Sequence, residues 1–215
     1  TLLYILQLGF LVKVFYPATE GLSPSGNTSR AEVTNVISYH FTLFNALSFV
    51  WSILFARKHW FWSEVILVIN FFNITALYFN HKTYALKPFD NWALIHLPIT
   101  AFPLSWLLYA IFWNGAVLFH FHHLFGRIVA NLLIWDFLLV PGFFLVIYND
   151  YGVGFSSAIL VFGLALGQLF TKVIALQWIF AFIIAGLLAL LSLVAAIRGD
   201  IAGARTSESA PLLSA

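Results

Sequence analysis

Asp136 is the residue best placed for chemistry, because it interrupts an apolar run of the length that spans a bilayer. It lies near the middle of NLLIWDFLLVPGFF, where an ionised carboxylate in lipid costs at least about 3 kcal/mol. Such a carboxylate is expected to face other helices and to pair with a polar group. Pro141 follows five residues later and can kink the helix at that depth. Asp136 is therefore either a functional residue or a hydrogen-bonded packing residue.

His96 is a second candidate, in the run LIHLPITAFPLSW. Pro98 and Pro103 follow it and remove backbone hydrogen bonds from the first turns of that helix, which can leave room for a ligand. His96 then either supplies a polar contact to that ligand or anchors the helix near the membrane surface.

Three tryptophans lie deep in their apolar runs and can line an apolar ligand site: Trp106, Trp135 and Trp178. The alternative is ordinary packing among helices, since aromatic residues make up 19% of the chain.

A histidine group, His120, His122 and His123, invites comparison with a metal site. Positions i, i+2 and i+3 do not share one helix face, and no carboxylate completes a zinc or di-iron set. We therefore expect no metal there and assign the group to a loop at a helix end, where histidines can respond to pH.

Two pairs of residues are predicted to pack helices together rather than to do chemistry. Asn70 and Asn73 lie about one turn apart on one apolar helix and can hydrogen-bond to a neighbouring helix. Gly163 and Gly167 form a small-xxx-small pattern, which allows close helix contact inside the bundle or between subunits.

The composition places these residues in a membrane protein. Of 215 residues, 62% are hydrophobic and 8% are charged, and mean hydropathy is +0.95. A water-soluble domain carries roughly a quarter charged residues, so a soluble fold is excluded. The net charge of +2 without a basic tract excludes nucleic acid as a partner. There are no cysteines, which excludes disulfides and thiolate chemistry.

The fold class predicted is all-α, a transmembrane bundle of about seven spans, because backbone groups in lipid must be satisfied within each segment. The bundle is expected over 1–197, with a flexible polar tail over 198–215 and a further N-terminal segment before Thr1. The expected spans are 1–16, 34–56, 61–80, 94–119, 126–148, 153–171 and 174–197.

The tail carries an acidic dileucine pattern formed by Glu208, Leu212 and Leu213. Such a pattern in a cytosolic tail resembles the sorting signals of vacuolar and endolysosomal membrane proteins. It favours an endomembrane location, although so short a pattern also arises by chance.

Four stretches of the chain resemble a fungal family of multi-pass membrane proteins, domain of unknown function 1774. They are HWFWSEVILVINFFNITALYFN, IHLPITAFPLSW, FWNGA and GLALGQLFTKVIALQWIFAF, and the resemblance extends over about 35–197. It implies a polytopic membrane protein and no particular activity.

The stretch FPLSWLLYAIFWNGA followed by ANLLIWDFLLVPGFF also resembles the tryptophan-rich sensory protein (translocator) family. Pro103, Trp106 and Tyr109 match its motif in order, whereas Asn131 to Trp135 match only loosely. That family has five helices and binds porphyrins and sterols, so the resemblance implies an apolar ligand near Trp106 and Tyr109.

The function predicted is therefore non-enzymatic: binding or transport of a small apolar or amphipathic molecule, such as a lipid, a sterol or a porphyrin-like compound. Asp136 and His96 would supply its polar contacts. One alternative is a structural or assembly subunit of a larger membrane protein complex or homo-oligomer. The other is a membrane-embedded enzyme that depends on histidine. The sequence identifies no cofactor, and the surrounding lipids are the expected partners.

Overall fold

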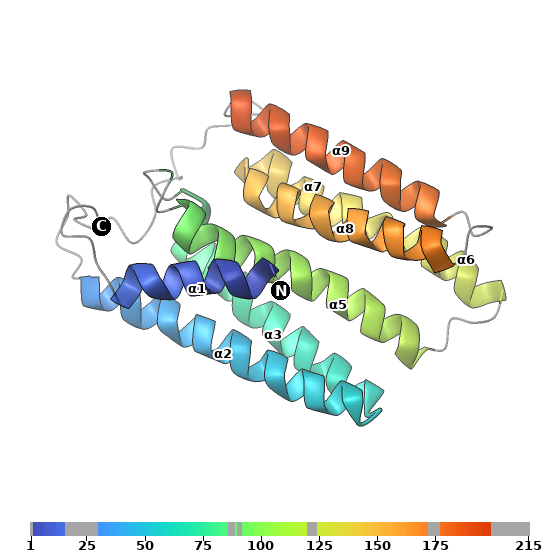
Figure 1. Cartoon of the computed structure of the whole chain (residues 1–215), viewed down its shortest axis with the longest axis horizontal. Coiled ribbons are helices and arrows are strands. Elements are labelled where there is room, and N and C mark those ends of the chain that lie inside the picture. The colour runs from blue at the N-terminus through green and yellow to red at the C-terminus, as the bar shows by residue number, and fades with distance from the viewer. Residues whose placement is uncertain are drawn as a thin grey trace.

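The computed structural model is an all-α bundle that describes residues 2–15, 30–85, 89, 92–119, 124–171 and 177–198 (Figure 1). The all-α class predicted from the sequence is confirmed. In chain order the elements are α1 (Leu2–Phe15), α2 (Arg30–Ala56), α3 (Trp60–His81), the 3₁₀ turn η1 (Thr83–Ala85), the π-helix η2 (Trp92–Ala101), α5 (Phe102–Leu118), α6 (Leu124–Leu133), α7 (Asp136–Tyr148), α8 (Tyr151–Thr171) and α9 (Gln177–Arg198).

Six helical segments among the described residues are long and apolar enough to cross a membrane. They are Ile37–Ala56, Trp60–His81, Trp92–Leu118, Ile128–Tyr148, Tyr151–Phe170 and Gln177–Ile197, and each lies within a few residues of a predicted span. The remaining predicted span, 1–16, corresponds to α1, which has 14 residues. A helix crossing the hydrocarbon core needs about 20, so α1 as described is too short to cross.

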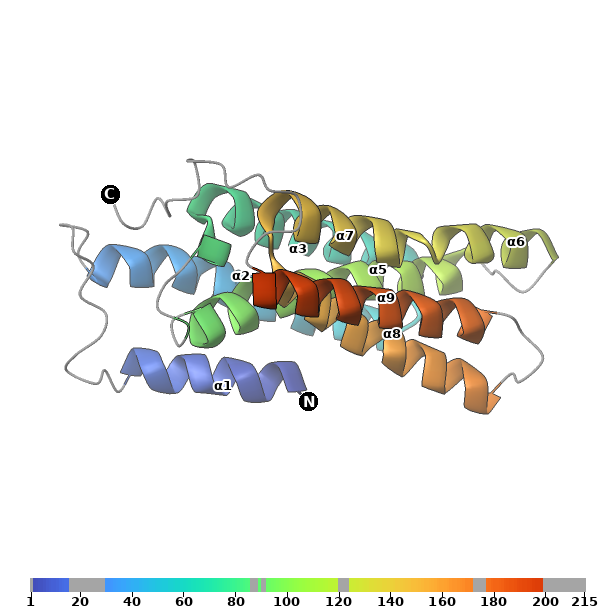
Figure 2. The same ribbon diagram turned by 90° about the horizontal axis from the view of Figure 1, so that it is seen from above.

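The long helices run side by side along one axis of the molecule (Figures 1 and 2). On one side α1 packs on η2, and α2 packs on α3. On the other side α7, α8 and α9 pack on one another. The central helix α5 contacts both α3 and α8 and so joins the two groups into one bundle.

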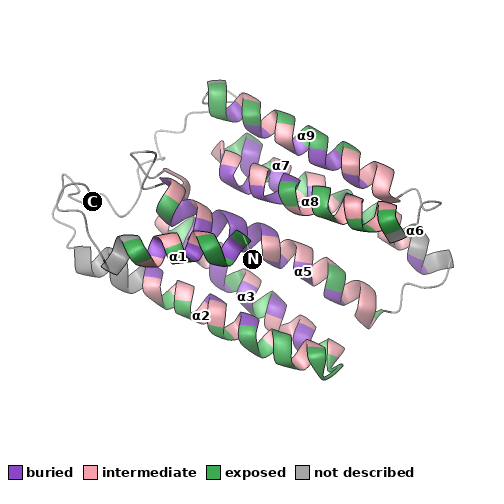
Figure 3. Ribbon diagram, in the orientation of Figure 1, coloured by how far each residue is buried: buried purple, intermediate pink, exposed green. Residues whose placement is uncertain are grey.

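Polarity is distributed as expected for a protein whose solvent is lipid (Figure 3). Large apolar side chains point outward, such as Phe49, Phe72 and Leu139, each more than 60% exposed. Polar side chains point inward, such as Ser63 and Asn114, which are fully buried. Because lipid provides no hydrophobic force between helices, buried polar groups and close packing select the arrangement.

Asn70 and Asn73 join α3 to α2 through side-chain hydrogen bonds. Asn70 Nδ2 donates to the carbonyl of Phe44 at 3.0 Å, and Asn73 Nδ2 donates to the carbonyl of His40 at 3.2 Å. The His40 ring Nδ1 lies 2.7 Å from Asn73 Oδ1. These contacts satisfy buried amides that would otherwise be costly in the membrane interior.

Gly163 and Gly167 lie on an exposed face of α8. A Cβ built at either glycine would meet no atom of the described residues within 4 Å, so this face does not bring two of the described helices together. Instead, α8 packs on α7 and α9 through buried residues that include Val161 and Ala165. A contact between subunits through the glycine pair stays a prediction.

Candidate functional site

A group of buried polar side chains lies at the end of the bundle where α3 ends, η2 begins and α7 meets α8. We call it the polar cluster; its members, each at most 2% exposed, are Tyr78, Thr83, His96, Thr100 and Asp150. Buried polar and ionisable groups in a membrane protein are costly and mark functional positions. The cluster is therefore the candidate site.

Thr83 reaches the cluster because the chain reverses immediately after α3. Lys82 adopts a left-handed conformation with φ of 44°, and its N–H donates to the carbonyl of Tyr78 at 3.1 Å. A residue in this conformation ends a helix and turns the chain back. The short turn η1 then places Thr83 over the start of η2.

His96 projects from the π-helix η2, whose geometry follows from its prolines. Pro98 cannot donate a backbone hydrogen bond inside the helix. In π-helical register the carbonyl of Pro98 would bond five residues ahead to Pro103, which also lacks an N–H. Gln7 of α1 supplies the missing donor, since its Nε2 lies 3.4 Å from the Pro98 carbonyl oxygen.

Asp150 is the N-cap of α8, and its carboxylate turns inward. Asn149 ends α7 in a left-handed conformation with φ of 53°, and two residues complete the reversal into α8. Asp150 Oδ1 accepts the backbone N–H groups of Gly152 at 2.9 Å and Val153 at 3.2 Å. This is the usual capping geometry for aspartate, and it fixes the carboxylate at the helix start.

A chain of hydrogen bonds connects the members of the cluster. His96 Nε2 lies 3.0 Å from Asp150 Oδ2 and 3.1 Å from Oδ1. On the other side of the ring, Nδ1 lies 2.9 Å from Thr83 Oγ1, which lies 3.1 Å from Thr100 Oγ1.

This chain of bonds can satisfy His96 in both of its protonation states. A neutral ring donates from Nε2 to the carboxylate and accepts at Nδ1 from Thr83. A protonated ring donates from both nitrogens, and Thr83 then donates onward to Thr100. The hydroxyl groups reverse direction between the two states, so neither state leaves a buried ring nitrogen unpaired.

The Tyr78 hydroxyl is buried against this pair. It lies near enough to Asp150 to interact with the carboxylate, at a geometry outside that of a regular hydrogen bond. The phenolic oxygen accepts no hydrogen bond from the described residues, so it can accept one from a further polar group.

Aromatic rings surround the polar cluster. Tyr78 stacks on Tyr84 at 5.1 Å and meets Tyr148 edge-on at 5.7 Å, whereas Trp92 lies 5.6 Å from the His96 ring. Gly152 is required beside them, since a Cβ there would lie 2.8 Å from Trp92 Cζ2. The arrangement can hold the polar end of an amphipathic molecule against rings that favour its apolar part.

The Asp150 carboxyl is ionised in this setting. Burial alone would raise its pKa, but the His96 imidazole and the Val153 N–H hold the pKa below the ordinary value of 3.8. A depressed pKa in the folded state means that ionised Asp150 stabilises the fold above about pH 4, and that this contribution is lost as the pH falls through the folded-state pKa.

We accordingly expect the wild-type protein to lose more stability than Asp150→Asn when the pH is lowered from about 5 to about 3. Thermal unfolding in detergent at a series of pH values measures both slopes. The other carboxylates titrate in both proteins. The difference between the two slopes of stability against pH is therefore the contribution of Asp150. Equal acid slopes would contradict the assigned role of this residue.

The structure brings only His96 of the predicted ligand-binding residues into the polar cluster. Asp136 lies at the other end of α7, roughly 20 Å away along a helix. It occupies the first turn of α7 and is partly exposed, where the helix start favours a negative charge.

The predicted aromatic residues form two separate groups. Trp106 stacks on Tyr109 at 5.8 Å along α5, within the bundle. Trp135 is 5.7 Å from Phe180 of α9, and Trp178 is 6.1 Å from Phe182 within α9 itself. The two groups belong to different contacts and do not line one site with His96.

Four members of the polar cluster are not predicted from the sequence: Tyr78, Thr83, Thr100 and Asp150. The available signal for Asp150 was its place in Asn149-Asp150-Tyr151-Gly152, since aspartate before a helix with glycine at its second position is typical of an N-cap. For the hydroxyl residues no signal existed, because single threonines and tyrosines are common in apolar helices.

Several predicted residues fall outside the part of the chain that the structure describes. They are the histidine group His120, His122 and His123, and the sorting signal Glu208, Leu212 and Leu213. The vacuolar location and the tail over 198–215 stay predictions. Within the described ranges, no group of three histidine, aspartate or glutamate residues is placed to hold a metal ion.

Comparison with known proteins identifies a curated relative and a family model that each match part of the chain. "Uncharacterized protein C637.03" of Schizosaccharomyces pombe (strain 972 / ATCC 24843) is 39% identical over 92 residues, which are 40% of this chain and 33% of that protein. The match thus spans about a third of the length of this curated relative. No solved structure matches the chain.

A family model described as "Fungal protein of unknown function (DUF1774)" matches residues 127–213, which include α7, α8 and Asp150. The sequence predicts this resemblance over about 35–197, whereas the family model matches a shorter stretch that lies nearer the C-terminus. The resemblance to the tryptophan-rich sensory protein family is not confirmed. Over residues 127–213 this chain matches the fungal family of unknown function that its sequence was predicted to resemble.

Proposed function

We propose that this integral membrane protein binds or moves a small amphipathic molecule whose polar group enters the polar cluster. The observation that carries the proposal is the buried pair His96 and Asp150, with the buried hydroxyl of Tyr78 beside it. Thr83 and two backbone N–H groups at the start of α8 already bond the pair. The groups left for a ligand are therefore the Tyr78 hydroxyl and the remaining lone pair of Asp150 Oδ2.

The backbone around His96 supports a binding role. Pro98 donates no backbone hydrogen bond within the π-helix η2, so unwinding this segment breaks fewer backbone bonds than unwinding a regular helix would. Irregular backbone at membrane depth is tolerated where protein or a polar cavity covers it. The segment Trp92–Ala101 is therefore the part of the bundle that opens to admit a ligand.

The proposal predicts that gently solubilised protein carries a stoichiometric small molecule. Native mass spectrometry, with lipid extraction and an absorption spectrum on the same sample, measures it. We expect His96→Gln and Asp150→Asn to lose the bound molecule. Ser157→Ala should keep it, because that hydroxyl bonds to Ser105 Oγ at 2.9 Å and takes no part in the cluster. Bare wild-type protein, or equal occupancy in all variants, would refute the proposal.

A second function, that of an assembly subunit, is favoured by the exposed glycine face on α8. Gly163 faces outward, and a Cβ there would meet no atom of the described residues within 4 Å. Such a face suits close contact with a helix of another subunit. In the same mass spectra, a protein partner at fixed stoichiometry without a small molecule would favour this function over ligand binding.

A further inference from the structure

A second polar group, separate from the polar cluster, surrounds Glu64 near the start of α3. Asn114 Nδ2 donates to Glu64 Oε2 at 2.6 Å and to the Trp60 carbonyl at 3.1 Å. Ser63 Oγ donates to Asn114 Oδ1 at 2.7 Å. Ser63 and Asn114 are fully buried, so the amide is held from both sides and fixes the carboxylate.

This arrangement leaves one carboxylate oxygen of Glu64 for a ligand. Asn114 is the only group bonded to the carboxylate in the described part of the chain, and it uses Oε2. The other oxygen, Oε1, faces Gly115, where a Cβ would lie 3.7 Å away. Glycine at this position keeps Oε1 uncovered. A half-buried carboxylate in a spanning helix is costly, and a positively charged partner lowers that cost.

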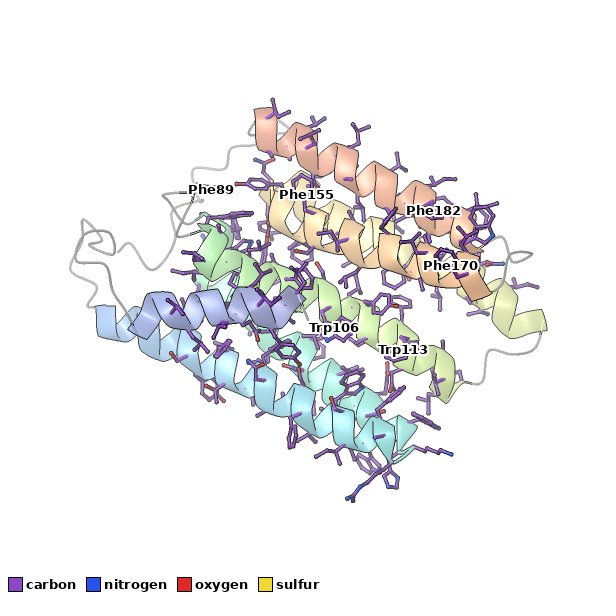
Figure 4. All side chains as sticks on the ribbon, in the orientation of Figure 1. Phe89, Trp106, Trp113, Phe155, Phe170 and Phe182 are labelled. Carbon is purple, nitrogen blue, oxygen red and sulfur yellow. The ribbon has the colours of Figure 1, made fainter. Side chains whose placement is uncertain are left out.

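Three aromatic rings at the same end of the bundle provide a second feature that suits a cation. Phe55 lies 4.7 Å from Trp60 and 5.1 Å from Trp113 between ring centroids. Trp60 is one helical turn before Glu64, and Trp113 directly precedes Asn114. Trp113 is 45% exposed, and it lies farther along α5 than Trp106, toward the end where α2 meets α3 (Figure 4). Aromatic faces attract ammonium groups, with tryptophan the strongest.

From this juxtaposition we propose that Glu64, with the rings of Phe55, Trp60 and Trp113, binds the ammonium group of a cationic amphiphile. The carboxylate accepts a hydrogen bond at Oε1, and the rings contact the ammonium from the side. The apolar tail extends along the outer faces of α3 and α5, which are covered by lipid.

The position of Glu64 inside a spanning helix favours an amphiphile with one positive charge over a hydrated free cation or a zwitterionic phospholipid. Arg57 and Lys58 are exposed on the loop before α3. Glu64 lies one turn deeper in the membrane than that loop. A phospholipid carries its ammonium outside its phosphate, which would leave the phosphate deeper than Glu64 among apolar side chains. A long-chain amine has no such group.

Titration of the full chain in phosphatidylcholine nanodiscs with dodecylamine, followed by calorimetry and corrected with empty nanodiscs, tests the proposal. We expect saturable binding at one site per protein and no saturable binding of dodecanol. Glu64→Gln should weaken dodecylamine binding about tenfold or more, since a hydrogen bond to a charged group is lost. Trp113→Leu should weaken it severalfold.

Two further variants keep the test independent of folding. Gly115→Leu removes no existing contact and covers Oε1, so it should also weaken dodecylamine binding. Trp62→Leu should leave binding unchanged, because Trp62 is an exposed tryptophan at the same end that is not part of the three rings. Equal binding of dodecanol and dodecylamine, or wild-type affinity in both Glu64→Gln and Gly115→Leu, would overturn the proposal. Neither outcome bears on ligand binding at the polar cluster.

Discussion

Replacing Asp150 with alanine is expected to lower the free energy of unfolding by about 3–5 kcal/mol, the cost of removing one partner of a buried pair. His96 would remain fully buried with Nε2 unpaired. The same change removes the N-cap of α8, which contributes about 1 kcal/mol. Unfolding of the purified protein in mixed micelles, followed by circular dichroism, measures the loss.

Two variants separate the pair from the cap. Asp150→Asn keeps an oxygen that accepts the backbone N–H groups at the start of α8, so we expect it to lose less stability than Asp150→Ala. Combining Asp150→Ala with His96→Leu removes both buried partners. The double variant should therefore lose less than the sum of the two single losses. Strict additivity would show that His96 and Asp150 do not stabilise each other.

Gly154→Ala is the second change with a large expected effect, a loss of about 1–3 kcal/mol or more. A Cβ at Gly154 would collide with Ser192 Oγ and would lie 2.8 Å from Leu145 Cδ1. Ser192 cannot turn away without losing its hydrogen bond to the Leu188 carbonyl at 2.6 Å. The added methyl group thus forces α8 away from both α7 and α9.

Gly163→Ala is the matched control, since it makes the same change on the same helix where a Cβ meets no atom within 4 Å. We expect no loss of stability there. Adding Ser192→Ala to Gly154→Ala should recover part of the loss, because the contact with Leu145 remains. Thermal unfolding in the same detergent measures all three variants. Equal stability of Gly154→Ala and Gly163→Ala would contradict the close packing.

The spanning helices could be predicted from the sequence because a bilayer couples composition to local structure. A backbone in lipid must bond within its own segment, so an apolar run of sufficient length becomes a helix whatever its neighbours are. The predicted span 61–80 and the observed helix Trp60–His81 illustrate this agreement. Asn70 and Asn73 lie three residues apart and so share a helix face, which the local pattern indicates, but their partners on α2 come from the structure alone.

The partner of His96 could not be predicted in this way. The sequence predicts Asp136 as that partner because a carboxylate within an apolar run is costly, but a turn at Ile134 and Trp135 starts a new helix at Asp136. The helix start offsets part of that cost locally. Asp150 lies 54 positions from His96, in a chain reversal that gives no sign of being buried in the sequence.

The sequence by itself therefore determined the class of the protein, its helices and their approximate ends, since these depend on interactions within each segment. Only the tertiary structure decided which polar residues meet. Thr83, His96 and Asp150 come together because η2 packs against both the turn after α3 and the connection between α7 and α8. That packing depends on side-chain shape and close approach between helices, which no pattern along the chain encodes.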